Sequence, residues 1–454
     1  MRAATLFLLA GVLAAETPKL AEPLQSIVEL AHAAPPEFAA DALLRVVESG
    51  KIKDRDARRD LVEQAFQLAA SARFQLRMRA LPGASTDTQA GSLGQAYDLK
   101  LDSLSLQSRA VRDMLAIDIP KARELFQTIP PPPLAPLTCN DALVYDVSDF
   151  YQTLSEIVSR AFLPAERKKE EHLNFLLTYV AQATSPLQLL PLERVIRNAN
   201  VTPAQRDVLW TTFNGLVEGM RSDGRSFSAS LTGLVSENAP EAQASIEKYR
   251  RQGVGCPEDG GSINPPTSAS SAPRAATPSA RPVAPPTPKV ERYWQSGEAQ
   301  RLLQGGLKLR ATPTGGLLTD ADRAAPEWQR EVTDYLSDLA GWTSGSETSD
   351  AVFYHEKCTV YQALVELIPL GPLRDETLAA FVNFVSNSDL QQQSPVEWFV
   401  EPNSMLERVR RTHGEESRRV LDAYQRSGNP VLILHTALER ALGAPSLTGI
   451  TGQN

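Results

Sequence analysis

The sequence predicts an all-α protein in which irregular helical hairpins stack in an α-solenoid-like array. Three observations lead to this prediction. Apolar residues recur at helical spacing in many segments, no series of segments alternates as a sheet requires, and one long segment is too rich in Pro, Ser and Ala to form a core. We expect a signal peptide (1–15), an N-terminal all-α domain (16–256), a disordered linker (257–291), a C-terminal all-α domain (292–446) and a flexible tail (447–454).

The chain begins with the pattern of a secretory signal peptide. Arg2 supplies a short positive region, residues 3–13 form an apolar core, and small residues follow, so cleavage after Ala14 or Ala15 fits. This apolar run is too short to cross a bilayer as a helix, and no other segment approaches the necessary length. We therefore expect an exported protein, periplasmic or extracellular, without a membrane span.

Helical periodicity appears on both sides of the linker. Four segments place their apolar residues on one helical face: 54–71, 172–180, 327–341 and 377–385. Helix starts agree with this pattern. Thr202, Pro203 and Gln205 form an N-cap, a first-turn proline and a capping-box glutamine, and Pro164 and Pro395 also suit first-turn positions. Helices of ordinary length, joined by short turns, are therefore expected throughout.

The linker is defined by composition. Residues 257–288 contain nine prolines among Ser, Ala and Thr, with almost no large apolar side chain. Such a segment cannot bury enough surface to offset the entropy of ordering it. It predicts an extended, disordered connection between two parts that are each large enough to form a core.

An internal duplication is suggested by two similar stretches, 141–158 and 350–368. The first matched pairs are Asp141/Asp350, Ala142/Ala351 and Tyr145/Tyr354. After a one-residue offset they are followed by Tyr151/Tyr361, Gln152/Gln362, Leu154/Leu364 and Glu156/Glu366. Ser185-Pro186 and Ser394-Pro395 follow in the same order, and EKYRRQG (247–253) corresponds to DAYQRSG (422–428). Collinear matches of this kind indicate that the two helical domains are related by duplication.

His355-Glu356-Lys357-Cys358 is the one place where a histidine, an acid and a cysteine crowd together. His355 and Cys358 could lie one helical turn apart and supply two metal ligands, but nothing nearby completes a zinc set. A Cys–His nucleophile pair has equally little support. We interpret the segment as a partly exposed first helical turn that carries a small buried cysteine, and we expect no metal or cofactor.

The remaining residues of interest have an ordinary structural interpretation beside a functional one. The recurring Tyr151/Tyr361 and Glu156/Glu366 could form carboxylate–phenol sites, but aromatic residues at helical spacing usually pack in a core. The three cysteines, Cys139, Cys256 and Cys358, could form one disulfide and leave one free thiol, and their spacing does not select the pair.

Charge and missing motifs exclude several function classes. The net charge is −8, which argues against nucleic-acid binding because that role needs a basic surface. Phosphate-binding glycine loops, the GxSxG nucleophile motif and EF-hand loops are missing from the sequence.

The favoured function is non-catalytic: stacked helices offer extended surfaces that bind other proteins or peptides, here an envelope or secreted partner. One alternative is an envelope hydrolase with an acidic site in a helical cleft, for which Glu156, Glu366, Glu356 and His355 are the first catalytic candidates. The other alternative is a purely structural periplasmic spacer.

Overall fold

The fold is described from a computed structural model of the chain. It describes residues 20–80, 88–132, 134–135, 143–222, 240–252, 292–312, 315–346, 348–412 and 416–443. The predicted signal peptide (1–15), linker (257–291) and tail (447–454), together with Cys139 and Cys256, lie outside the described residues.

The described part of the chain is built almost entirely of helices, which confirms the predicted all-α class. Strands β1 (Met78–Ala80) and β2 (Leu143–Tyr145) form a single antiparallel pair, in which Met78 lies opposite Tyr145. The solenoid-like stacking stays a prediction.

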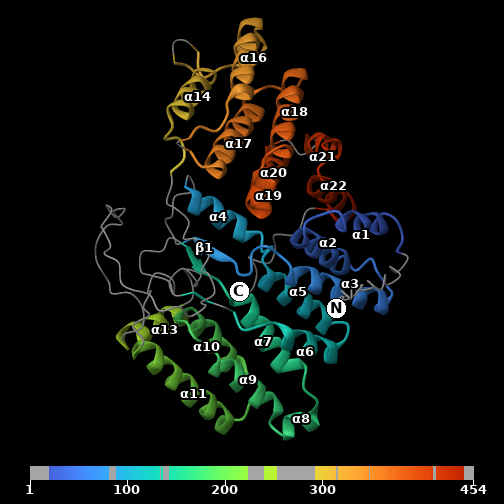
Figure 1. The fold of residues 1–454 in the computed structure, drawn as a ribbon, viewed down its shortest axis with the longest axis vertical. Helices are drawn as coiled ribbons and strands as arrows, with labels where there is room; N and C mark the ends of the chain where they lie inside the picture. Colours follow the sequence, from blue (N-terminus) through green and yellow to red (C-terminus); the bar gives the residue numbers. More distant parts are fainter. Residues whose placement is uncertain are drawn as a thin grey trace, which may run out of the picture.

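The first group of helices packs into the middle of the molecule (Figure 1). Its members are α1 (Leu24–Ala31), α2 (Pro36–Glu48), α3 (Arg55–Ala70), α4 (Gln89–Asp98), α5 (Ser103–Leu115) and α6 (Ile119–Thr128). Asp54, Thr88, Asp102 and Asp118 start four of these helices by accepting a hydrogen bond from a backbone N–H in the first turn. Helices α2, α3 and α5 contact one another and bury their apolar faces together.

The second group forms the lower part of Figure 1. It consists of α7 (Ser148–Arg160), α8 (Pro164–Lys168), α9 (Glu171–Ala181), the 3₁₀ helix η1 (Pro186–Gln188), α10 (Leu189–Asn198), α11 (Pro203–Ser222) and α13 (Pro240–Arg251). The predicted capping box is confirmed: Thr202 N–H donates to Gln205 Oε1 at 3.0 Å, and Gln205 N–H donates to Thr202 Oγ1 at 3.3 Å. Pro164 begins α8 as predicted.

The third group forms the upper part of Figure 1 and returns to the middle. Its helices are α14 (Gly297–Lys308), α15 (Asp320–Ala324), α16 (Pro326–Gly341), α17 (Asp350–Leu367), α18 (Pro372–Ser386), α19 (Leu390–Gln393), α20 (Pro395–Thr412), α21 (Ser417–Arg426) and α22 (Pro430–Leu442). The predicted apolar faces are buried: Trp328, Val332, Tyr335 and Leu339 in α16, and Leu378, Phe381, Val382 and Val385 in α18.

Helices from before and after residues 257–291 contact one another. Helix α4 packs on α20 and α17, and α22 packs on α1 and α2. Arg45 of α2 lies 3.3 Å from Glu439 of α22, and one hydrophobic cluster contains residues of all three groups. Residues of the two predicted domains therefore contribute to a common core, while the predicted domain boundaries stay a prediction.

The two matched stretches differ locally. In the first, Tyr145 ends strand β2 and α7 begins at Ser148, whereas in the second one continuous helix runs from Asp350 to Leu367. Tyr151 and Tyr361 nevertheless both lie buried on the first helix of their set. In both sets that helix contacts the next long helix, α9 or α18, and also α10 or α20. The duplication stays a prediction.

Candidate functional site

The four side chains of His355-Glu356-Lys357-Cys358 are buried in the first half of α17. This differs from the partly exposed first turn that the sequence predicted. The difference arises because α17 is enclosed by α4, α14, α18 and α20, so that polar positions of the helix also face protein. Each polar side chain of the quartet then needs a partner inside the protein.

His355 is at the centre of a buried polar cluster contributed by three helices. Its Nε2 lies 2.5 Å from Ser92 Oγ of α4, and its Nδ1 lies 2.7 Å from Glu401 Oε1 of α20. Glu401 Oε2 accepts a hydrogen bond from Gln362 at 2.7 Å. The connection Ser–His–Glu is that of a hydrolase triad, in which a histidine accepts the serine proton and an acid orients the histidine.

The surroundings of this cluster favour a structural role over catalysis. Nε2 also faces Glu397 Oε1 at 3.6 Å, and the ring of Tyr293 stacks on the imidazole with 5.7 Å between centroids. Although burial opposes the charge, the two carboxylates raise the pKa of His355 to about 9, so the imidazole is protonated at neutral pH and cannot accept a serine proton. Ser92 is 3% exposed, and its own N–H is already bonded to the Thr88 carbonyl. We call Ser92, His355, Glu397, Glu401 and Gln362 the His355 cluster.

Glu356 and Lys357 also have protein partners, and Cys358 is buried beside them. Glu356 Oε1 accepts a hydrogen bond from the backbone N–H of Trp294. Lys357 Nζ donates to the Trp342 carbonyl at 2.7 Å and lies 4.8 Å from the centre of the Phe384 ring, and burial lowers the pKa of this lysine to about 8. Cys358 is a free thiol, whose pKa burial raises well above its usual value.

The remaining catalytic candidates are not brought together. Glu156 lies on the surface of α7 with Arg160 at 3.8 Å, and Glu366 lies near the end of α17 with Arg408 at 3.1 Å. Tyr151 accepts a hydrogen bond from Gln188 Nε2 at 2.9 Å and packs in the core, as the structural interpretation predicted. No carboxylate–phenol pair forms at Tyr151 among the described contacts.

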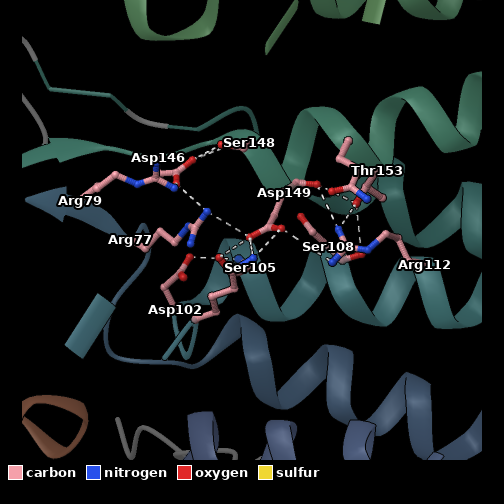
Figure 2. Close-up of polar contacts among 12 residues, drawn as sticks. Arg77, Arg79, Asp102, Ser105, Ser108, Arg112, Asp146, Ser148, Asp149 and Thr153 are labelled. Atoms are coloured by element: carbon pink, nitrogen blue, oxygen red, sulfur yellow. Dashed lines mark hydrogen bonds and ion pairs between the residues drawn. The ribbon is translucent and has the colours of Figure 1, made fainter. Parts of the chain in front are cut away.

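A second buried polar cluster lies between α5, α7 and the strand pair (Figure 2). Asp146 Oδ2 lies 2.5 Å from Arg77 Nη2, and Asp149 of α7 lies 3.5 Å from the same nitrogen. Arg112 of α5 donates to Thr153 Oγ1 at 2.9 Å. The cationic neighbours lower the pKa of Asp146 even though burial opposes this. In the matched stretches Asp146 takes the place of His355, and both are buried groups that pair with residues of other elements, although Asp146 precedes α7 and His355 lies within α17.

An apolar groove of about 120 Å³ lies between α14 and α17. Its walls include Leu303 and Leu307, whose side chains are 38% and 56% exposed. The other lining residues are Trp294, Gly306, Arg310, Tyr335, Thr359, Val360, Ala363, Leu364 and Leu367. We call this feature the α14–α17 groove.

Glycines at positions 305 and 306 shape the α14–α17 groove. The Tyr335 hydroxyl donates to the Leu302 carbonyl at 2.8 Å, and a Cβ atom at Gly305 would lie 2.9 Å from Tyr335 Cε2. Any larger residue at Gly305 would push the tyrosine away from α14. The Gly-Gly pair inside a helix was therefore a sequence signal for this close approach, and the sequence analysis missed it.

Comparisons with protein-family models, with curated proteins and with solved structures found no match to this chain. Two further findings concern the described residues alone. No group of three or more His, Cys, Asp or Glu side chains there is arranged to hold a metal ion. Among the helices of this part, none combines the length and the apolar content that crossing a bilayer requires.

Proposed function

We propose that this chain is an exported, non-catalytic binding protein that holds an apolar peptide segment of an envelope or secreted partner in the α14–α17 groove. The observation that carries the proposal is the pair of exposed leucines, Leu303 and Leu307, in the wall of a groove whose lining is otherwise mostly apolar. Exposed leucines that line a concave surface favour the binding of a complementary apolar segment.

The composition of the groove indicates the chemistry of the partner segment. Leu303 and Leu307 are four residues apart on α14 and present one apolar stripe, and Arg310 is the charged residue of the lining. An amphipathic helix matches such a stripe when it places aliphatic side chains at positions i and i+4. An acidic side chain next to this pair would complement Arg310.

The two alternatives have less support. A hydrolase would need its acidic groups in one accessible place, whereas Glu156 and Glu366 lie in separate surface ion pairs and His355 is enclosed. A purely structural spacer would not need exposed leucines such as Leu307 along a groove, because their exposure to water is unfavourable.

The test is affinity capture from the envelope fraction of the source cells with three versions of the full chain. These are the wild type, Leu307→Asp in the groove, and Leu163→Asp as a matched control, since Leu163 is a 68% exposed leucine outside the groove. Losing one buried leucine contact weakens binding by about 2 kcal/mol, or roughly thirtyfold. We expect one stoichiometric partner that the wild type and the control retain and that Leu307→Asp loses.

Two results would contradict the proposal. If Leu307→Asp captures the same partner as the wild type, the groove is not the binding site. If no version captures a stoichiometric partner, the spacer function becomes the better interpretation. A captured partner should also yield a peptide with two aliphatic residues at i and i+4. In direct titration this peptide should bind the wild type and the control, and should bind Leu307→Asp more weakly.

A further inference from the structure

A cleft of about 270 Å³ lies where the end of α2, the start of α3 and the last turn of α5 meet. These three helices pack side by side in the middle of the molecule (Figure 1). Unlike the α14–α17 groove, the cleft has a mixed charge. Its lining residues are Val47, Glu48, Gly50, Ile52, Lys53, Arg58, Arg112, Asp113 and Ala116. A cavity of this size and polarity suits a small polar molecule.

Two lining groups are buried polar atoms without a hydrogen-bond partner among the described residues. They are Nε of Arg58 and Oδ2 of Asp113. The first belongs to a cation that can only donate, and the second belongs to a carboxyl group that can accept. Because buried polar groups are normally paired, two orphan atoms of complementary kind in one cleft point to a ligand that pairs with both.

The other charged groups of the cleft are already engaged. Both carboxylate oxygens of Glu48 accept hydrogen bonds from Arg109, each at 2.6 Å. The Arg112 guanidinium points toward α7, where it donates to Thr153 (Figure 2). Lys53 Nζ donates to the Gly50 carbonyl at 3.0 Å. Arg58 and Asp113 are therefore the cleft residues that retain capacity for a ligand.

We propose that this cleft binds a small zwitterion, a free α-amino acid or a dipeptide, with the ligand carboxylate on Arg58 and the ligand ammonium on Asp113. A guanidinium is the preferred protein partner of a carboxylate. An ammonium group supplies the donor that Asp113 Oδ2 lacks. Glu48 lies beside Asp113 and adds negative potential at the same end of the cleft.

The protonation of Asp113 provides an independent readout. Burial and the neighbouring Glu48 raise the pKa of Asp113 to about 7 against the opposing charges of Arg109 and Arg112, so most of the free protein carries a proton there at pH 6. An ammonium next to the carboxyl group favours its ionised form, and binding at pH 6 should release a proton to the buffer. At pH 8 the carboxyl group is already ionised, and the release should be much smaller.

The experiment is calorimetric titration of the full chain at pH 6 and pH 8, in two buffers with different ionisation enthalpies. The probes are glycine, L-alanine and glycylglycine, with N-acetylglycine and glycinamide as ligands that lack one of the two charges. The variants are Arg58→Gln and Asp113→Asn, and Arg59→Gln serves as a matched control because Arg59 is the next arginine of α3, lies outside the cleft lining and pairs with Asp56.

We expect saturable binding of at least one zwitterion and proton release at pH 6 that Asp113→Asn abolishes. Arg58→Gln, Asp113→Asn and removal of either ligand charge should each weaken binding roughly tenfold or more, while Arg59→Gln should bind as the wild type does. The proposal is overturned if no zwitterion binds saturably up to about 10 mM, if the two cleft variants bind as well as the wild type, or if glycinamide and N-acetylglycine match glycine.

Discussion

Replacing His355 with glutamine should remove a pH-dependent part of the stability of the fold. The pKa of His355 rises from the 6.5 of a free imidazole to about 9 in the folded protein, because Glu397 and Glu401 stabilise the imidazolium more than burial opposes it. A group whose pKa is higher in the folded state stabilises the fold when protonated. Its contribution is complete below about pH 6.5 and disappears as the pH rises past about 9.

The magnitude follows from the same two pKa values. Each pH unit between them corresponds to about 1.4 kcal/mol, so protonation of His355 contributes on the order of 3 kcal/mol at pH 6. About 2 kcal/mol should remain at pH 7.5, and almost none at pH 10. The side chain is 1% exposed, so solvent does little to screen these interactions.

The assay is urea unfolding followed by tryptophan fluorescence from pH 6 to pH 10. Other groups titrate in this range: the effect of Lys357, whose pKa burial lowers to about 8, has the opposite sign, and that of Asp113, whose pKa is raised to about 7, has the same sign. The informative quantity is therefore the difference in unfolding free energy between the wild type and His355→Gln at each pH. His435→Gln is the control, because burial lowers the pKa of His435 to about 4 and keeps it neutral throughout.

The expected difference for His355→Gln shrinks by about 3 kcal/mol between pH 6 and pH 10. The difference for His435→Gln should change by less than about 1 kcal/mol and in the opposite direction, because this imidazole is neutral in the folded protein and titrates near 6.5 only in the unfolded chain. A cost of His355→Gln that does not change with pH would refute the assignment of His355 as a buried imidazolium. This conclusion does not depend on the size of the packing defect that glutamine introduces, since that defect is present at every pH.

Three further results are expected. Gly305→Ala should destabilise the protein by about 1 to 3 kcal/mol in urea unfolding, because the new Cβ atom meets the Tyr335 ring. Gly215→Ala, in an open part of α11, should instead stabilise the protein by up to about 1 kcal/mol. Equal effects of the two substitutions would contradict the close packing of α14 against Tyr335. Cys358 should remain unmodified by a thiol reagent in the native protein, as read by peptide mass spectrometry, and react after unfolding. Ser92 should not react with a fluorophosphonate probe, because its neighbouring imidazole is protonated, and labelling would restore the hydrolase alternative.

The fold class and many helices could be predicted because their signals are local. The buried face of α18 and the cap at Thr202 follow from residues a few positions apart, and such patterns survive any tertiary arrangement. The exposure of His355 could not be predicted in this way. It depends on Ser92, which lies 263 residues earlier in the chain, and on Glu401, 46 residues later.

The candidate sites were missed for the same reason. Arg58 of α3 and Asp113 of α5 have strand β1 and helix α4 between them in the chain, and neither belongs to a recognisable motif. In the sequence, Leu303 and Leu307 have the spacing of an ordinary buried apolar stripe. Their exposure to solvent is visible only in the tertiary structure. The Gly305-Gly306 pair was the one local signal near the groove, because glycine destabilises a helix interior and usually indicates close packing there.

Helix α4 joins the parts of the molecule that hold the two proposed binding sites. Near its start, Ser92 contacts His355 of α17, and just after its end, Lys100 lies 3.3 Å from Asp149 of α7. Buried charges contribute little stability compared with apolar side chains, but they tolerate only an arrangement in which each finds its partner. A sliding or rotation of α4 would break the contact between Ser92 and His355 and the ion pair between Lys100 and Asp149, whereas purely apolar contacts could adjust. We therefore infer that the polar contacts at both ends of α4 favour one placement of this helix between α17 and α7.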